Sequence, residues 1–327
     1  MSKRRGLLFF TLRVAISGLL LFWLGRKFGG SLAQLKGVEP AQLWIAVLLF
    51  AASTVLGALQ WAMLLWHGGV RMRFAGLLRL YWIGMFCSNF LPSSVGGDVV
   101  KIADVAVSEG GVARTIAATV LDRLLGLLTL VILAFAWGAY LGGRNPAGIP
   151  WWLLAVAALP VLGTLALLLS RRLSQLLIRA IRALSKGARG QRITSLAEQF
   201  AAFRLAPGLL FRVLALSLLV QGLRISTHLA VARELGWPLD IQRVAEFFVV
   251  IPVLALAIVL PVSFNGLGLR ELVATRIMPQ IGIGAEAAVT LQLSTYLVQV
   301  AVSLVGGVLF AIELSRGRLF GRRRNSD

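Results

Sequence analysis

Long apolar runs recur along the whole of this 327-residue chain and limit its fold more than any other feature. A run of about 20 apolar residues is long enough to cross the hydrocarbon core of a bilayer as a helix. Hydrophobic residues make up 58% of the chain. Charged residues make up 14%, against about 25% in a typical soluble domain. The sequence therefore predicts an all-α, polytopic membrane protein with one integral membrane domain over residues 1–327.

Six segments have the length and uninterrupted apolar character of ordinary transmembrane helices. They are residues 7–25, 41–66, 115–141, 151–169, 207–230 and 285–313. The first follows Lys3, Arg4 and Arg5, as the apolar core of a secretory signal peptide would. However, its small-residue cleavage site would lie beyond Arg26 and Lys27. We therefore expect this segment to remain in the protein as its first helix.

Basic residues divide the loops between these segments into two sets. Twenty of the 33 Lys and Arg residues lie in the N-terminal tail, in 67–74, 101–114 and 170–206, or in the tail 314–327. The remaining loops hold six, and seven lie within membrane segments. Cytoplasmic loops are enriched in Lys and Arg. We therefore expect both termini to be cytoplasmic and the protein to reside in a bacterial inner membrane.

Two irregular apolar regions, 75–100 and 244–284, do not fit this orientation as ordinary spans. Residues 75–100 begin and end at predicted cytoplasmic loops, and they are too few for two spans of about 20 residues each. Because 170–206 and the C-terminal tail are expected on the cytoplasmic side, span 207–230 should end outside and span 285–313 should start outside. Residues 244–284 must then enter and leave from the outer face. The sequence therefore predicts two re-entrant helical hairpins. One lies in a first half over 7–169 and the other in a second half over 207–313.

The tips of the two hairpins share the pattern Leu-Pro-x-Ser-x-[Gly/Asn]-Gly-x-x-x-[Lys/Arg], which starts at Leu91 and again at Leu260. Proline lacks an N–H and disfavours helix at the residue before it, so each incoming arm should end near Pro92 or Pro261. Because the two copies occur in opposite orientations, we expect an inverted-topology repeat, a plan in which transporters bind substrate near the midplane. The alternative is that proline and glycine only kink two packed helices.

Polar, charged and glycine residues near the tips are candidate substrate-binding residues. Free N–H groups at the start of each second arm attract an anion, and guanidinium binds phosphate through two hydrogen bonds. Charge at depth in a membrane is costly, so we expect pairs such as Asp98 with Arg123 and Glu271 with Arg224. Ion pairs that only lock the hairpins are the alternative. The candidates are Ser94, Gly96, Gly97, Asp98, Lys101, Asp122, Arg123, Arg224, Ser263, Asn265, Gly266, Arg270 and Glu271.

The cytoplasmic linker 170–206 contains a segment, 171–205, that is typical of an element lying on an anionic membrane surface. An apolar stripe at helical spacing is formed by Leu173, Leu176, Leu177, Ile181 and Leu184. The other positions of this predicted helix are rich in arginine, as in basic amphipathic helices at the cytoplasmic leaflet. A role in anchoring the topology alone is the alternative.

Several classes of site are excluded by composition. His67 and His228 are the only histidines and Cys87 is the only cysteine, so we expect neither a clustered metal site nor a disulfide scaffold. We expect no cofactor, and the absence of a Gly-x-x-x-x-Gly-Lys-[Ser/Thr] loop disfavours direct use of ATP. We expect no nucleic-acid partner either, since the net charge of +20 flanks apolar spans. The sequence neither predicts nor excludes assembly into a homo-oligomer.

Three stretches of the chain resemble the lysylphosphatidylglycerol synthase transmembrane family, also called the flippase-like domain family. They are Leu91 to Lys101, Asp122 to Gly126, and Pro261 to Glu271, and the resemblance covers roughly 10–315. It implies a domain that moves lipids between leaflets. Many members have a glycine-rich tip where this chain has Pro92-Ser93-Ser94-Val95-Gly96-Gly97. Only 13 residues follow Leu314, so we expect the soluble aminoacyl-transferase domain of some members to be absent.

Translocation of an anionic phospholipid or polyprenyl-phosphate-linked lipid is the leading hypothesis, and we expect a transporter rather than an enzyme. The candidate contacts to the lipid phosphate are Lys101, Arg123, Arg224 and Arg270. One alternative is a membrane-embedded lipid-phosphate transferase with Asp98, Asp122 or Glu271 as general base. The other is a transporter of a small anion, coupled to protons through His228 or Glu271.

Overall fold

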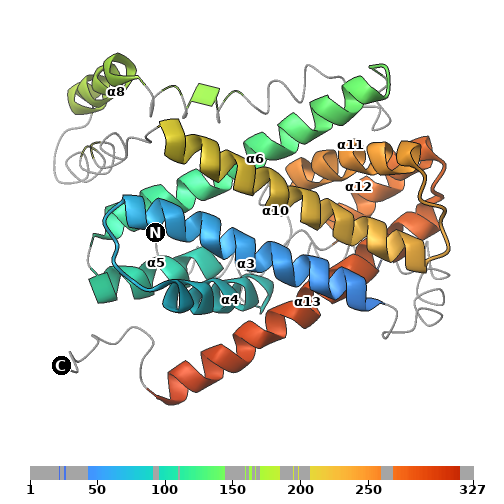
Figure 1. The fold of residues 1–327 in the computed structure, drawn as a ribbon, viewed down its shortest axis with the longest axis horizontal. Coiled ribbons are helices and arrows are strands. Elements are labelled where there is room, and N and C mark those ends of the chain that lie inside the picture. Colours follow the sequence, from blue (N-terminus) through green and yellow to red (C-terminus); the bar gives the residue numbers. More distant parts are fainter. Residues whose placement is uncertain are drawn as a thin grey trace.

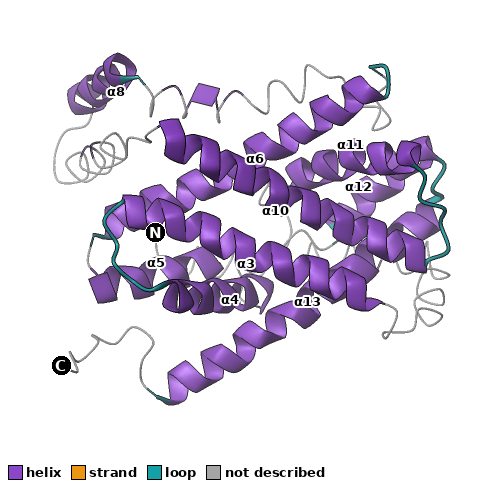
Figure 2. Ribbon diagram, in the orientation of Figure 1, coloured by secondary structure: helices purple, strands orange, loops and turns teal. Residues whose placement is uncertain are grey.

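The computed structural model describes residues 43–90, 96–109, 111–143, 170–184, 207–258 and 268–316, with a few isolated positions elsewhere. Within these ranges every regular element is a helix, so the predicted all-α class is confirmed (Figure 2). The helices are α3 (Trp44–His67), α4 (Phe74–Phe90), α5 (Gly96–Glu109), α6 (Val112–Tyr140), α8 (Arg171–Leu184), α10 (Pro207–Glu234), α11 (Ile241–Ile258), α12 (Leu269–Ile277), the 3-10 helix η3 (Met278–Ile281) and α13 (Ala285–Ser315).

Four helices in the described ranges are long and apolar enough to cross a membrane. They are α3, α6, α10 from Gly208 onward, and α13. They agree within a few residues with the predicted spans 41–66, 115–141, 207–230 and 285–313. The predicted spans 7–25 and 151–169 lie almost entirely outside the described residues.

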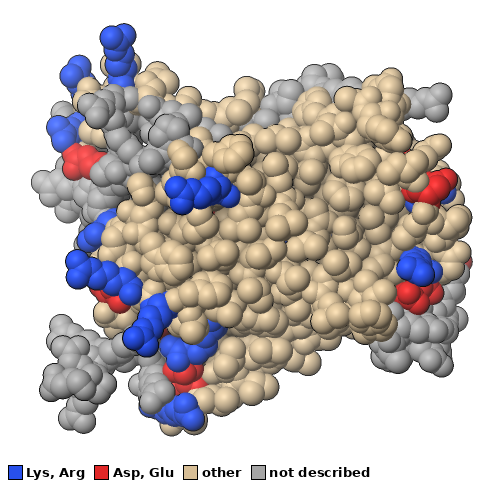
Figure 3. Space-filling model, in the orientation of Figure 1, with Lys and Arg blue, Asp and Glu red and all other residues tan. Residues whose placement is uncertain are grey.

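The ends of the long helices gather at two opposite ends of the molecule (Figure 1). The loop 68–73, the start of α6, α8 and the last turn of α13 lie at one end, which we call the basic end. The loops 141–143 and 235–240 lie at the other. In Figure 3 most of the visible Lys and Arg side chains lie at the basic end, and the broad central area of that face is almost free of charge.

Two pairs of helices each begin and return at one end of the molecule. α4 starts at the basic end and α5 returns to it, whereas α11 and α12 start from and return to the opposite end (Figure 1). At a rise of 1.5 Å per residue, α4 with 17 residues is about 25 Å long and α5 with 14 is about 21 Å. Neither reaches the thickness of about 30 Å of a hydrocarbon core.

The second arm of the first pair is longer than the sequence analysis predicts. Residues 101–109 continue α5, although 101–114 was predicted to be a loop, so the pair extends beyond 75–100 to Glu109. Three charged residues that recur every three residues along α5 face the protein interior. Asp98, Lys101 and Asp104 are 5%, 7% and 5% exposed. The second pair likewise starts at Ile241, slightly before the predicted 244.

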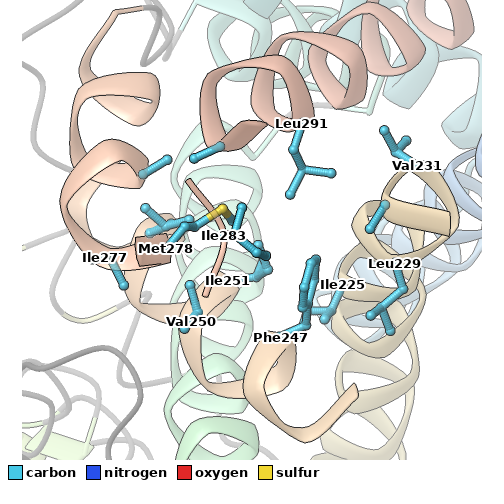
Figure 4. Packing of buried hydrophobic residues seen from close by; sticks show 14 of the residues in the cluster. Ile225, Leu229, Val231, Phe247, Val250, Ile251, Ile277, Met278, Ile283 and Leu291 are labelled. Carbon is cyan, nitrogen blue, oxygen red and sulfur yellow. The ribbon is translucent and has the colours of Figure 1, made fainter. Parts of the chain in front are cut away.

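Two clusters of buried apolar side chains hold the helices together. One cluster connects α10, α11, η3 and α13, which contribute Ile225, Phe247, Met278 and Leu291 respectively (Figure 4). The other joins α3, α4, α5 and α6 around Trp61 and Leu121. In lipid, apolar burial alone gives little drive for helix association, so close van der Waals packing is required. Interdigitation within these clusters supplies that packing.

Glycines bring α4 into close contact with two neighbouring helices. A Cβ atom at Gly97 of α5 would lie 1.8 Å from the carbonyl oxygen of Gly84 on α4. A Cβ atom at Gly306 of α13 would lie 2.0 Å from the carbonyl oxygen of Trp82. Backbones approach this closely only where a side chain is missing, as at small-residue interfaces of membrane helices. Gly97 is therefore fixed by packing, whatever else it does.

Candidate functional site

Asp98 bridges two cations from the first turn of α5. Its Oδ1 atom lies 2.9 Å from Nζ of Lys101, one turn further along the helix. Its Oδ2 atom accepts a hydrogen bond from Nε of Arg123 on α6. The expected pairing of Asp98 with Arg123 is therefore confirmed. The carboxylate is buried, so this shared ion pair ties the start of α5 to α6.

Lys101 is held in an aromatic enclosure. Its Nζ atom lies 5.0 Å from the ring centroid of Trp61 and 4.7 Å from that of Tyr81. Trp61 is itself fixed by a hydrogen bond of 3.0 Å from its Nε1 atom to Oγ1 of Thr119. Cation–π contacts of this kind stabilise a desolvated ammonium. Lys101 is thus engaged by Asp98 and two rings, which suits it to positioning Asp98.

Arg123 is exposed although it lies deep along a membrane span. It is the twelfth residue of α6, about 17 Å from the start of a helix about 43 Å long. Its side chain is 56% exposed, against 6% for the Asp98 side chain that binds its Nε atom. A charged group at such depth is costly unless it faces water, a partner or a polar ligand. The guanidinium is therefore anchored on one side and open on the other.

Asp122 faces a different set of neighbours from Arg123. Gln60 of α3 donates a hydrogen bond of 2.8 Å from Nε2 to Oδ1 of Asp122. Asp122 is also close enough to Lys101 and Arg224 for their charges to act on it. Asp122 thus connects the α5–α6 charges to α10, which belongs to the second half of the chain.

Arg224 of α10 is only partly neutralised among the described residues, by the charge of Asp122 acting at a distance. It forms no ion pair there, and its buried Nε atom has no hydrogen-bond partner. Nδ1 of His228, one turn further on, lies 3.0 Å from the carbonyl oxygen of Arg224 and so engages only its backbone. Arg224 is half-buried, and an arginine at this depth with an unused buried N–H is suited to bind an anion.

A second charged group lies at the start of α12. Nε of Arg270 is 3.4 Å from Oε1 of Glu271, and its guanidinium lies 4.4 Å from the ring centroid of Tyr296. The Gly268 N–H donates a 2.7 Å hydrogen bond to Oε2 of Glu271. The expected pairing of Glu271 with Arg224 is therefore wrong. Glu271 caps its own helix and pairs with its neighbour, because it lies three residues after the N-cap.

The structure brings together only part of the predicted site. Asp98, Lys101, Asp122, Arg123 and Arg224 form one group, which we call the central charge cluster, and Arg270 with Glu271 forms a separate pair. Gly96 opens α5, two residues before Asp98. The predicted tip residues Pro92, Ser94, Pro261, Ser263, Asn265 and Gly266 lie outside the described residues.

Sequence reasoning missed the neutral residues that surround these charges. Gln60, Trp61, Tyr81 and Tyr296 were not among the candidates. Two signals could have found them. Gln60 is a polar amide inside an apolar run, and the chain has only three tyrosines, of which two lie over a buried cation.

A protein-family model described as the lysylphosphatidylglycerol synthase TM region matches residues 10–307. The chain belongs to this family. The resemblance inferred from the tip motifs is thereby confirmed. No curated protein matches the chain. Together with its four long apolar helices, membership of the lysylphosphatidylglycerol synthase TM family makes this a multi-pass membrane protein.

Proposed function

We propose that the chain moves a lipid with an anionic phosphate head group between the leaflets of a bacterial inner membrane. The observation that carries this proposal is the pair of incompletely neutralised guanidinium groups, Arg123 and Arg224, in the interior of two membrane spans. A lipid phosphate would supply the missing negative charge, while the acyl chains stay in the bilayer.

The charge balance of the central charge cluster favours an anionic head group. Lys101, Arg123 and Arg224 contribute three positive charges, and Asp98 and Asp122 contribute two negative ones. The tip segments 91–95 and 259–267 contain no charged residue in the sequence, so they do not change this balance. The cluster therefore has a net charge of +1, which one additional negative charge would neutralise.

The helix pairs provide the second line of support. In our proposal α4–α5 enters from the cytoplasm and α11–α12 from the outer face, as re-entrant hairpins of an inverted-topology repeat. The predicted spans 7–25 and 151–169 complete six transmembrane helices, with both termini cytoplasmic. The basic end then faces the cytoplasm, in keeping with the enrichment of Lys and Arg in cytoplasmic loops. The head group would pass the midplane beside the starts of α5 and α12.

Each residue of the central charge cluster has a distinct role in this mechanism. Arg123 and Arg224 contact the phosphate in turn, and their planar forks bind two of its oxygens. Lys101 and Asp98 hold Arg123 in place through its Nε atom, which leaves the outer nitrogens for the lipid. Gln60 orients Asp122, whose charge balances Arg224 when no lipid is bound.

Replacing Arg224 by alanine tests this assignment. Because Arg224 forms no direct ion pair with a described residue, its removal should cost less stability than breaking the direct pair between Asp98 and Arg123. A lost hydrogen bond to a charged group is worth about 1.5–3 kcal/mol, so we expect lipid movement to slow by roughly 10-fold to 100-fold. The measurement is the loss of leaflet asymmetry of a fluorescent anionic lipid in proteoliposomes.

Two variants control for non-specific effects. Arg233→Ala removes an exposed arginine near the end of the same helix and should leave lipid movement unchanged. Arg224→Lys keeps the charge without the planar fork and should give an intermediate rate. Unchanged lipid movement in Arg224→Ala would exclude Arg224 as a phosphate contact.

A further inference from the structure

α8 is an amphipathic helix that stands apart from the rest of the structure. It lies beside the basic end, away from the long helices, and packs extensively against none of the described helices (Figure 1). With 14 residues it is about 21 Å long, too short to span a bilayer. The protein therefore carries a separate helix at the end where Lys and Arg gather.

The two faces of α8 have opposite character. At 100° per residue, positions 173, 176, 177, 181 and 184, all leucine or isoleucine, fall within roughly 140° of one face. On that face Leu173 is 44% exposed and Leu176 is 58% exposed. All four arginine positions of the helix fall on the opposite face, and α8 contains no acidic residue. The described part of the apolar stripe, Leu173 and Leu176, is thus left uncovered on a strongly basic helix.

The positive charge of α8 indicates which kind of partner covers this stripe. Arg172 and Arg179 are exposed and form no ion pair with a described residue, while Arg182 pairs with Glu198. A short helix with leucines on one face and several arginines on the other binds at the interface of an anionic leaflet. Its apolar face then enters the boundary between head groups and acyl chains, and its arginines contact lipid phosphates.

We propose that α8 lies in the plane of the leaflet at the basic end of the protein and binds anionic phospholipid there. The leucine stripe is immersed among the acyl chains, and Arg172 and Arg179 face the head groups and water. This surface is distinct from the central charge cluster and does not depend on lipid movement across the membrane. It would hold the segment between the two halves of the chain on one leaflet.

The test places a polarity-sensitive fluorophore on each face of α8 in the full-length chain. In a Cys87→Ala background, single cysteines replace Leu176 on the apolar face and Gln175 on the basic face, and each is labelled. The labelled chains are reconstituted into nanodiscs of phosphatidylcholine alone or mixed equally with phosphatidylglycerol. We expect quenchers attached to acyl chains to quench the 176 probe at least about 3-fold more than the 175 probe in the anionic discs.

The basic face is tested separately. The Arg172→Gln/Arg179→Gln variant should lose most of the additional quenching that anionic lipid produces at position 176. Equal access of a water-soluble quencher to both probes would overturn the proposal. So would a 176 probe that is shielded from water but not quenched from the lipid, since that would mean that protein covers the stripe. Equal quenching at position 176 in both lipid mixtures would overturn the binding of anionic lipid.

Discussion

Gly97→Ala should sharply lower the amount of folded protein. The new Cβ atom would lie 1.8 Å from the carbonyl oxygen of Gly84 and 2.3 Å from Oγ of Ser88, so α4 and α5 would have to separate. Overpacking typically costs about 1–3 kcal/mol, and a clash with backbone belongs at or above the upper end. We expect a large fall in yield and in thermal stability in detergent.

Gly222→Ala is the matched control for this prediction. Gly222 also lies within a helix, α10, but a Cβ atom there would meet nothing within 4 Å. The same added methyl group should therefore leave yield and melting temperature nearly unchanged. Equal melting temperatures for Gly97→Ala and Gly222→Ala would contradict the close packing of α4 on α5.

Asp98→Asn should have the second large effect, because it removes the one anion that Lys101 and Arg123 share. Breaking a buried ion pair by removing one partner costs about 3–5 kcal/mol. We expect a corresponding loss of thermal stability, followed as unfolding in detergent. Lipid movement should also slow, because Arg123 would lose the contact that positions its guanidinium.

A second substitution distinguishes loss of charge balance from loss of shape. Asp98→Asn/Lys101→Met restores the net charge of the pair and places an apolar side chain between Trp61 and Tyr81. This double variant should be more stable than Asp98→Asn alone. If the effects of the two substitutions simply add, the ion pair does not hold α5 in place.

The membrane spans could be predicted from the sequence because each is a long, continuous apolar run. The predicted span 285–313 coincides with α13 to within two residues, and 115–141 with α6 to within three. The pair Asp98–Arg123 was also predicted, because charges at depth in a membrane need partners. In each case one strong physical constraint limits the possible arrangements.

Features that depend on two distant stretches were not accessible in this way. Residues 101–109 were predicted to belong to a loop, because Lys101 and Arg114 suggested a basic cytoplasmic segment, and only the fold shows that Lys101 and Asp104 face inward on a helix. The contact of Gly97 with Gly84 depends on how α5 crosses α4, which a sequence pattern does not specify. Glu271 pairs with Arg270 because of a local cap, whereas charge counting alone assigned it to Arg224.

The most direct test of the proposed lipid pathway is chemical restoration of charge at position 224. In the Cys87→Ala background, the Arg224→Cys chain is treated with aminoethyl or with sulfonatoethyl methanethiosulfonate, and complete modification is checked by mass spectrometry. Movement of a fluorescent anionic lipid is then measured in proteoliposomes. A positive charge at this site should speed lipid movement at least about 10-fold relative to a negative one. Equal rates for the two fully modified chains would contradict passage of an anionic head group beside Arg224.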